Sequence, residues 1–165
     1  KNKVLLKKVP IFMSMNEDEL TLLSQSCKRI HFNNSDMIIK QKDPGDSLYI
    51  IADGVVSVQL DLENGSRKIV SKLGVGDFFG EMSLMTGETR TANIIAESPT
   101  VVINVEKEII KTLFSNNTHF FDTVSNILAK RKIDLENIKI SNLEDAPNIK
   151  NIASEMKKAI MHFLS

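Results

Sequence analysis

The stretch that decides the fold is GVGDFFGEMSLMTGETRTA, residues 74–92. It combines glycines, small hydroxyl residues and carboxylates with one arginine: Gly74, Gly76, Gly80, Ser83, Thr91, Glu81, Glu88 and Arg90. Amide N–H groups at the start of a helix face an anion, glycine permits close approach, and arginine supplies a forked positive charge. The stretch therefore predicts a site for a small anionic ligand, in which Arg90 takes a phosphate and Glu81 accepts from a sugar hydroxyl.

On both sides of this stretch the sequence changes to short β-type runs. Turn pairs such as Asp53-Gly54 and Asn64-Gly65 separate them, and these pairs are strong hairpin signals. The predicted strands are residues 37–40, 47–52, 55–60, 67–73, 91–97 and 100–105. Short strands without long helices between them predict a mainly β, antiparallel sandwich or barrel. Residues 74–92 are the one irregular stretch within the series that is long enough to hold a ligand.

Helical patterns flank the predicted strands. Residues 1–30 are expected to be helical, with a break at Pro10 and a capping box formed by Asn16 and Glu19. The apolar stripe of this segment consists of Leu20, Leu23, Cys27 and Ile30.

Three further helices are predicted after the strands. Asn104 is the expected N-cap of a helix over residues 105–115, and a longer amphipathic helix begins near Thr118. The apolar stripe of this long helix comprises Phe120 or Phe121, Val124, Leu128, Leu135 and Ile138, with Arg131 on the same face. Pro147 suits the start of a final amphipathic helix.

Composition excludes several classes of function. The 165 residues suit one domain with an appended element, and 21 basic residues balance 21 acidic ones. A neutral chain lacks the overall positive charge of a nucleic-acid or membrane-surface protein, and no apolar run reaches the length of a membrane span. The single cysteine, Cys27, forbids a disulfide framework and favours a reducing, cytoplasmic compartment. The first residue is Lys1, which suggests a piece of a longer polypeptide.

The motifs of common enzymes are missing from the sequence. The glycines at 74, 76 and 80 do not fit a dinucleotide fingerprint, and there is no P-loop and no G-x-S-x-G. His31, His119 and His162 lie too far apart in sequence to predict a metal site. Glu81 and Glu88 are a conceivable acid/base pair, but Arg90 would keep a nearby carboxylate ionised. We therefore expect a binding module without a cofactor, not an enzyme.

FGEMSLMTGETRTA, residues 79–92, closely resembles the phosphate-binding cassette of cyclic nucleotide-binding domains. DPGDSLYIIADGVVSV at 43–58 resembles a hairpin of that family, and VPIFMSMNEDELTLLSQSC at 9–27 resembles its N-terminal helical segment. The resemblance covers about residues 9–138. It implies an antiparallel, jelly-roll-like β-roll (a double-stranded β-helix) of eight strands, with an N-terminal helical segment and C-terminal lid helices.

The resemblance also implies a role for individual residues. Arg90 would hold the cyclic phosphate and Glu81 the ribose 2′-hydroxyl, while Gly80 and Ser83 would supply backbone contacts. Thr91 would add a hydroxyl near the phosphate or the base; the proline that usually precedes the arginine is Thr89 here.

Contacts to the base are expected from outside the cassette. Arg131 and Leu135, one helical turn apart, are candidate lid contacts, although an ordinary surface arginine and a core leucine fit equally well. Leu73 lines either the base pocket or the core.

Residues 1–140 are expected to form the nucleotide-binding domain. Residues 141–165 would form an amphipathic helix that extends the lid, contacts a partner, or begins a truncated region. The predicted function is a regulatory module that binds cAMP or cGMP and passes occupancy through its C-terminal helices to an effector. Two alternatives remain open: a truncated sensor domain of a catabolite-activator-type transcription factor, and a scaffold that keeps the fold without ligand. Only about 25 residues follow the long helix, too few for a helix-turn-helix domain.

Overall fold

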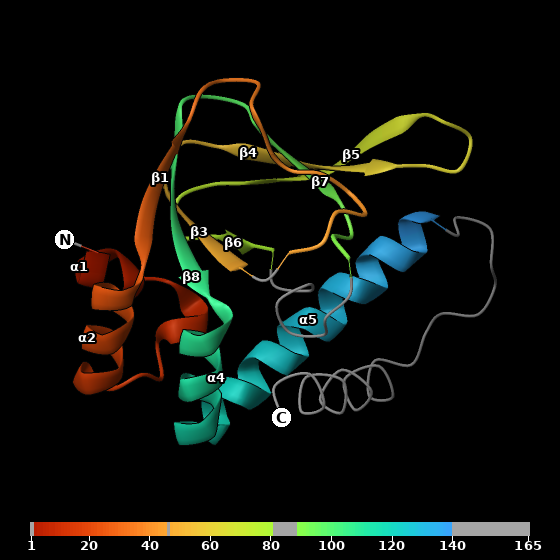
Figure 1. Cartoon of the computed structure of the whole chain (residues 1–165). Helices are drawn as coiled ribbons and strands as arrows, with labels where there is room; N and C mark the ends of the chain where they lie inside the picture. Colours follow the sequence, from red (N-terminus) through yellow and green to blue (C-terminus); the bar gives the residue numbers. More distant parts are fainter. Residues whose placement is uncertain (1, 46, 81–88, 140–165) are drawn as a thin grey trace.

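The protein, in a computed structural model, folds into two antiparallel sheets with helices packed against one of them (Figure 1). The structure describes residues 2–45, 47–80 and 89–139. One sheet has the strand order β1-β8-β3-β6 and the other β2-β7-β4-β5. The strands are β1 (Lys28–Phe32), β2 (Met37–Ile39), β3 (Ser47–Asp53), β4 (Val56–Asp61), β5 (Arg67–Leu73), β6 (Phe78–Phe79), β7 (Asn93–Ala96) and β8 (Thr100–Glu106). This arrangement confirms the predicted β-roll.

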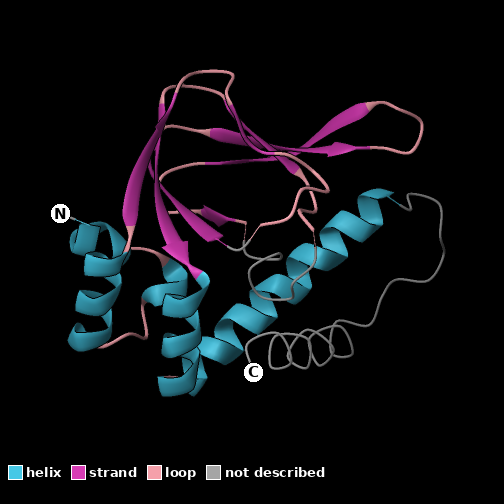
Figure 2. Ribbon diagram, in the orientation of Figure 1, coloured by secondary structure: helices cyan, strands magenta, loops and turns pink. Residues whose placement is uncertain are grey.

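The helices gather on one side of the strands (Figure 2). They are α1 (Asn2–Leu6), the 3₁₀ helix η1 (Pro10–Phe12), α2 (Glu17–Ser26), α4 (Lys107–Asn116) and α5 (Thr118–Lys139). The break at Pro10 is confirmed, and so is the capping box of α2. Its Asn16 Oδ1 accepts from the Glu19 amide at 2.9 Å, and the Asn16 amide donates to Glu19 Oε1 at 3.1 Å. Among the described residues, no helix combines the length and the apolar character that a membrane span requires.

Alternation along the strands of the β1-β8-β3-β6 sheet divides the interior into two cores. Leu48 and Ile50 of β3 face the helices, where Phe12, Phe120 and Leu128 are fully buried. Neighbouring side chains point the other way, because successive residues of a strand face opposite sides. This second set packs between the two sheets and comprises Ile51, Phe79 and Val102 with Ile39, Val56 and Ile94. The helices therefore cover one face of this sheet, and the second sheet covers the other.

Three local predictions were wrong. Residues 28–32, which include Ile30, form strand β1 and not the end of a helix, because β8 pairs with them from Lys28 opposite Asn104 to Phe32 opposite Thr100. Asn104 lies inside β8, and the N-cap of α4 is Glu106, which makes no side-chain cap bond. Cys27 is the C-cap of α2 and so lies just beyond the helix, although it packs, half-buried, against the core as its apolar pattern predicts.

Candidate functional site

Arg90 is a buried cation held by backbone carbonyls. The residue is only 7% exposed, and its Nη1 donates to Gly80 O at 2.8 Å and to Ser47 O at 3.3 Å. Its Cζ atom lies 5.8 Å from the centre of the Tyr49 ring, within the range of a cation–π contact. Burial of a charge costs several kcal/mol unless partners offset it. The fold therefore fixes Arg90 at the point where the described part of the cassette meets strand β3.

The backbone of Arg90 is also paired. Its amide donates to Asp43 O at 2.8 Å, and its carbonyl accepts from the Lys42 amide at 2.7 Å. These bonds join the end of the cassette to the loop between β2 and β3. The main chain of Arg90 is thus paired with residues 42–43, and its side chain with Gly80 and with Ser47, which lies 43 positions earlier in the sequence.

Two glycines make room for the guanidinium. A Cβ atom on Gly45 would lie 2.1 Å from Arg90 Nε, and one on Gly80 would lie 2.9 Å from Arg90 Nη1. Gly80 also has a φ of 82°, a left-handed conformation that L-residues with a side chain rarely adopt. Gly80 was predicted to give a backbone contact to the cyclic phosphate; in the structure its carbonyl accepts from Arg90 Nη1, and the contact to a phosphate remains a prediction.

Three contributors to this site were not predicted. They are Gly45, the carbonyl of Ser47 and the ring of Tyr49. The carbonyl contact leaves no mark in the sequence, because every residue carries that group. The Pro44-Gly45 pair was a usable signal, since a glycine in a turn permits close approach as well as reversal of the chain.

The other predicted site residues differ in what the structure shows. Thr91 is half-buried beside Arg90, and Leu73, at the end of β5, packs against the core between the sheets. Glu81 and Ser83 lie outside the described residues, as does the side chain of Leu135. The roles proposed for them remain predictions.

Arg131 of α5 docks on strand β6. Its Nη1 donates to Phe78 O at 2.8 Å, and its Cζ lies 4.0 Å from the centre of the Phe78 ring. Phe78 is buried and stands two residues before Gly80. The long helix is therefore tied to the strand that leads directly into the Arg90 site. Arg131, predicted as a lid residue, makes its contact here with the protein's own backbone.

Comparisons with known proteins agree with this arrangement. The sequence profile of the family described as "Cyclic nucleotide-binding domain" matches residues 29–117. A cGMP-dependent protein kinase of Drosophila melanogaster is 36% identical over 146 residues, which cover 85% of this chain and 15% of the kinase. The type II regulatory subunit of cAMP-dependent protein kinase from the same organism is 36% identical over 92 residues, covering 56% of this chain and 24% of the subunit. The chain thus spans a small part of these relatives.

Solved structures also resemble this one. The regulatory domain of Toxoplasma gondii protein kinase A, crystallised with cAMP, aligns with a TM-score of 0.67 and 26% identity. The alignment covers 79% of this chain and 48% of that one. The shared fold includes the β-roll on which the Arg90 site is built.

Proposed function

Since this chain belongs to the cyclic nucleotide-binding domain family, we propose that it binds cAMP or cGMP, with Arg90 holding the cyclic phosphate. In this proposal Glu81 accepts from the ribose 2′-hydroxyl, and Gly80 and Ser83 provide backbone contacts. Thr91 contributes a hydroxyl near the phosphate or the base, and Leu73, Arg131 and Leu135 are the candidate contacts to the base. The module acts by binding and catalyses no reaction.

One observation carries the proposal: a buried arginine whose guanidinium is oriented by the carbonyls of Gly80 and Ser47. A guanidinium has five N–H donors in a rigid plane, and this geometry suits an anion with several oxygens. A phosphate at this place would offset part of the cost of burying the charge. The missing side chains of Gly45 and Gly80 leave room for the guanidinium in this buried position.

Helix α5 is the element that we propose transmits occupancy to an effector. A ligand shifts a conformational equilibrium only when it binds one state better than the other. The contact between Arg131 and Phe78 ties α5 to the segment that carries Gly80, so a change at the phosphate site reaches the helix through two residues. The effector in the longer relatives is a kinase domain or kinase subunit by their names, and a kinase is the partner class that we propose here.

Calorimetric titration of the chain with cAMP and with cGMP tests binding and identifies the preferred nucleotide. Arg90→Ala should weaken binding at least tenfold, because a hydrogen bond to a charged group contributes about 1.5–3 kcal/mol. The matched control is Arg29→Ala, which removes an exposed arginine of β1 and should leave the affinity unchanged. Equal affinity of Arg90→Ala and the parent would refute the phosphate assignment, and failure of the parent to bind either nucleotide would favour the scaffold alternative.

Amide hydrogen exchange on the same samples tests the transmission step. Exchange over Thr118–Lys139 should change when the preferred nucleotide is added. Unchanged exchange throughout α5, in a sample that calorimetry shows to be saturated, would contradict transmission through this helix.

A further inference from the structure

We propose that Gln41 positions Arg90 for the phosphate by fastening the segment that pairs with the Arg90 backbone to the end of strand β4. This inference rests on the proposed function, since it assigns a supporting residue to the same phosphate site. Gln41 lies outside the cassette, and the carbonyls that accept from the Arg90 guanidinium are those of Gly80 and Ser47.

The first link is the short bridge at Arg90. Lys42 donates to Arg90 O and Arg90 donates to Asp43 O, so residues 42–43 run beside Arg90 as a two-bond ladder. Neither side of this ladder belongs to a regular strand. Its position therefore depends on what holds residues 41–43 in place.

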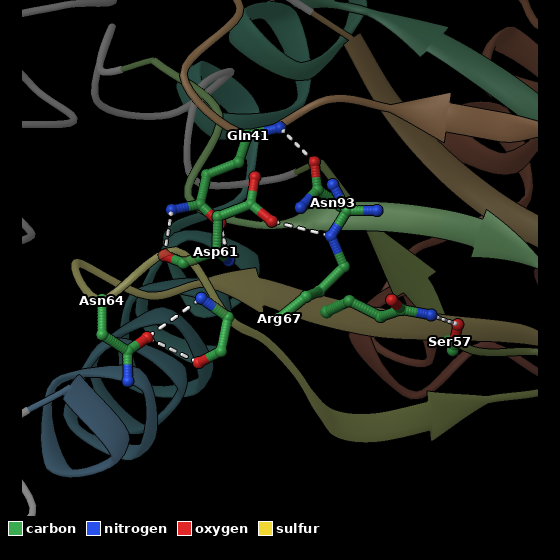
Figure 3. A network of polar contacts seen from close by, with 8 residues as sticks. Gln41, Ser57, Asp61, Asn64, Arg67 and Asn93 are labelled. Carbon is green, nitrogen blue, oxygen red and sulfur yellow. Dashed lines mark hydrogen bonds and ion pairs between the residues drawn. The ribbon is translucent and has the colours of Figure 1, made fainter.

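The second link is the side chain of Gln41. Its Nε2 donates to Asp61 O at 3.2 Å, and its Oε1 accepts from the Asp61 amide at 2.7 Å. A primary amide presents one donor and one acceptor side by side, so it can replace a peptide group of a neighbouring strand. Gln41 thereby pairs with both backbone groups of the last residue of β4, as Figure 3 shows.

The third link is Asn93, which holds the backbone of Gln41. Its Oδ1 accepts from the Gln41 amide at 2.8 Å, and Asn93 itself is fully buried. Asn93 begins β7 and is paired with Gln59 of β4. Gln41 is consequently fixed by its main chain to β7 and by its side chain to β4.

Asp61 is itself held at the turn end of the β4–β5 hairpin. It pairs with Arg67 across the two strands, and Arg67 Nε donates to Asp61 Oδ1 at 2.7 Å. This hydrogen bond is the main reason why the pKa of the Asp61 carboxyl lies below its usual value. The hairpin end is thus a defined support, and Gln41 connects it to the Arg90 segment.

Positioning matters here because a binding group must be held within about 0.5 Å of its productive place. Loss of the Gln41 side chain leaves the Lys42 and Asp43 bonds intact but releases their segment from β4. We therefore expect the phosphate contact to weaken while the fold and the contacts to the rest of the nucleotide persist.

The test compares Gln41→Ala with Gln59→Ala in the full chain. Gln59 is a matched control, since it is a glutamine of the same sheet whose side-chain Nε2 donates to Ser57 Oγ at 2.8 Å, within its own strand. Without nucleotide, Gln41→Ala should speed amide exchange at Lys42 and Arg90 roughly fivefold or more, as loss of about one net hydrogen bond predicts. Gln59→Ala should leave both amides unchanged.

Binding affinities distinguish positioning of Arg90 from a general structural role of Gln41. Gln41→Ala should weaken the binding of cAMP or cGMP roughly fivefold, again the effect of about one net hydrogen bond. The affinity for the corresponding nucleoside, measured by competition with the nucleotide, should stay the same, because the nucleoside lacks the phosphate. Gln41→Met keeps the length of the side chain but has neither the amide donor nor the amide acceptor, so its effect should match that of Gln41→Ala, and it serves if Gln41→Ala does not fold.

Two outcomes would overturn the inference: equal exchange at Lys42 and Arg90 in the Gln41 and Gln59 variants, or equal loss of nucleotide and nucleoside binding. Failure of the parent chain to bind either nucleotide would refute the proposed function instead. In that case the exchange measurement still decides whether Gln41 holds the Arg90 segment.

Discussion

Replacement of Gly45 by alanine is the most direct way to disturb the Arg90 site without removing its charge. Gly45 does not have a left-handed φ, so alanine fits its backbone conformation. The new methyl group, however, would lie 2.1 Å from Nε and 2.3 Å from Nη2 of Arg90, whereas ordinary contact begins at 3.4 Å. The substitution therefore acts on the guanidinium and not on the fold of the loop.

The size of the effect follows from this geometry. The guanidinium must move on the order of 1 Å to restore ordinary contact, and hydrogen bonds from nitrogen to oxygen rarely exceed ~3.2 Å. Its bond to Gly80 O, now 2.8 Å, would break or tilt. Loss of one or more bonds to a phosphate, at about 1.5–3 kcal/mol each, predicts affinity that is lower by at least tenfold.

Thermal stability should change far less than affinity. The clashing atoms are the far end of a flexible side chain, which can turn toward water without moving the backbone. A loss of about 1 kcal/mol would lower the midpoint of thermal unfolding by about 2–4 °C in a domain of this size. The affinity and the midpoint thus separate a damaged site from a damaged fold.

Calorimetric titration with cAMP and cGMP, beside thermal unfolding, measures both quantities. Gly74→Ala is the matched control, because a Cβ at Gly74 meets no atom within 4 Å and the residue does not have a left-handed φ. It should bind as the parent does. If Gly45→Ala binds as tightly as Gly74→Ala, then Arg90 does not need this position to bind the ligand, and the reasoning is wrong.

Two further predictions concern the helices. Arg131→Ala should speed amide exchange in α5 roughly fivefold, by loss of about one net hydrogen bond, whereas removal of the exposed side chain in Lys130→Ala should not; equal rates would show that the β6 contact does not hold the helix. Lys3 and Lys7 donate to Glu17 and lower its pKa from 4.5 to about 2, so their stabilising effect is complete above pH 4.5 and is lost as the pH falls toward 2. As the pH falls from 4.5 toward 2, the midpoint of thermal unfolding should fall further for the parent than for Glu17→Gln. Parallel curves of midpoint against pH would contradict this role of the ion pairs.

The hairpins of the fold could be predicted because their signals are local. Asn64-Gly65 lies between β4 and β5, where Gly65 has a φ of 85°, and Asp53-Gly54 lies between β3 and β4 with a φ of 92° at Gly54. These conformations favour glycine for steric reasons alone. Because such turns depend only on neighbouring residues, they can be predicted from the local sequence.

Strands defined by distant partners could not be read in the same way. Ile30 continues the helical spacing of Leu23 and Cys27, yet the chain leaves the helix at Cys27, with φ −93° and ψ 156°. Strand β1 exists because the edge of β8 accepts it, and the two-residue strand β6 exists because Tyr49 and Ile50 pair with it. Long-range pairing overrides the local pattern in both places.

The site divides along the same line. Arg90 and Gly80 were predictable, since a charge and a missing side chain are properties of single residues. The carbonyls of Ser47 and Phe78 were not, because only the folded chain brings them to Arg90 and Arg131. Sequence could therefore name the cation, and only the structure could name what orients it.

The two arginines share one short segment, and this has a thermodynamic consequence. Arg131 holds Phe78 O, and Arg90 holds Gly80 O two residues later. If a ligand draws Arg90 toward its phosphate, as we propose, it alters the segment on which α5 is docked. Coupling between two binding equilibria is reciprocal, so a nucleotide that favours release of α5 must bind more tightly, by the same factor, to a chain in which α5 is already released. A gain of affinity in Arg131→Ala would therefore show that the nucleotide prefers the released α5, whereas a loss is expected both from a preference for the docked helix and from removal of the proposed contact between Arg131 and the base.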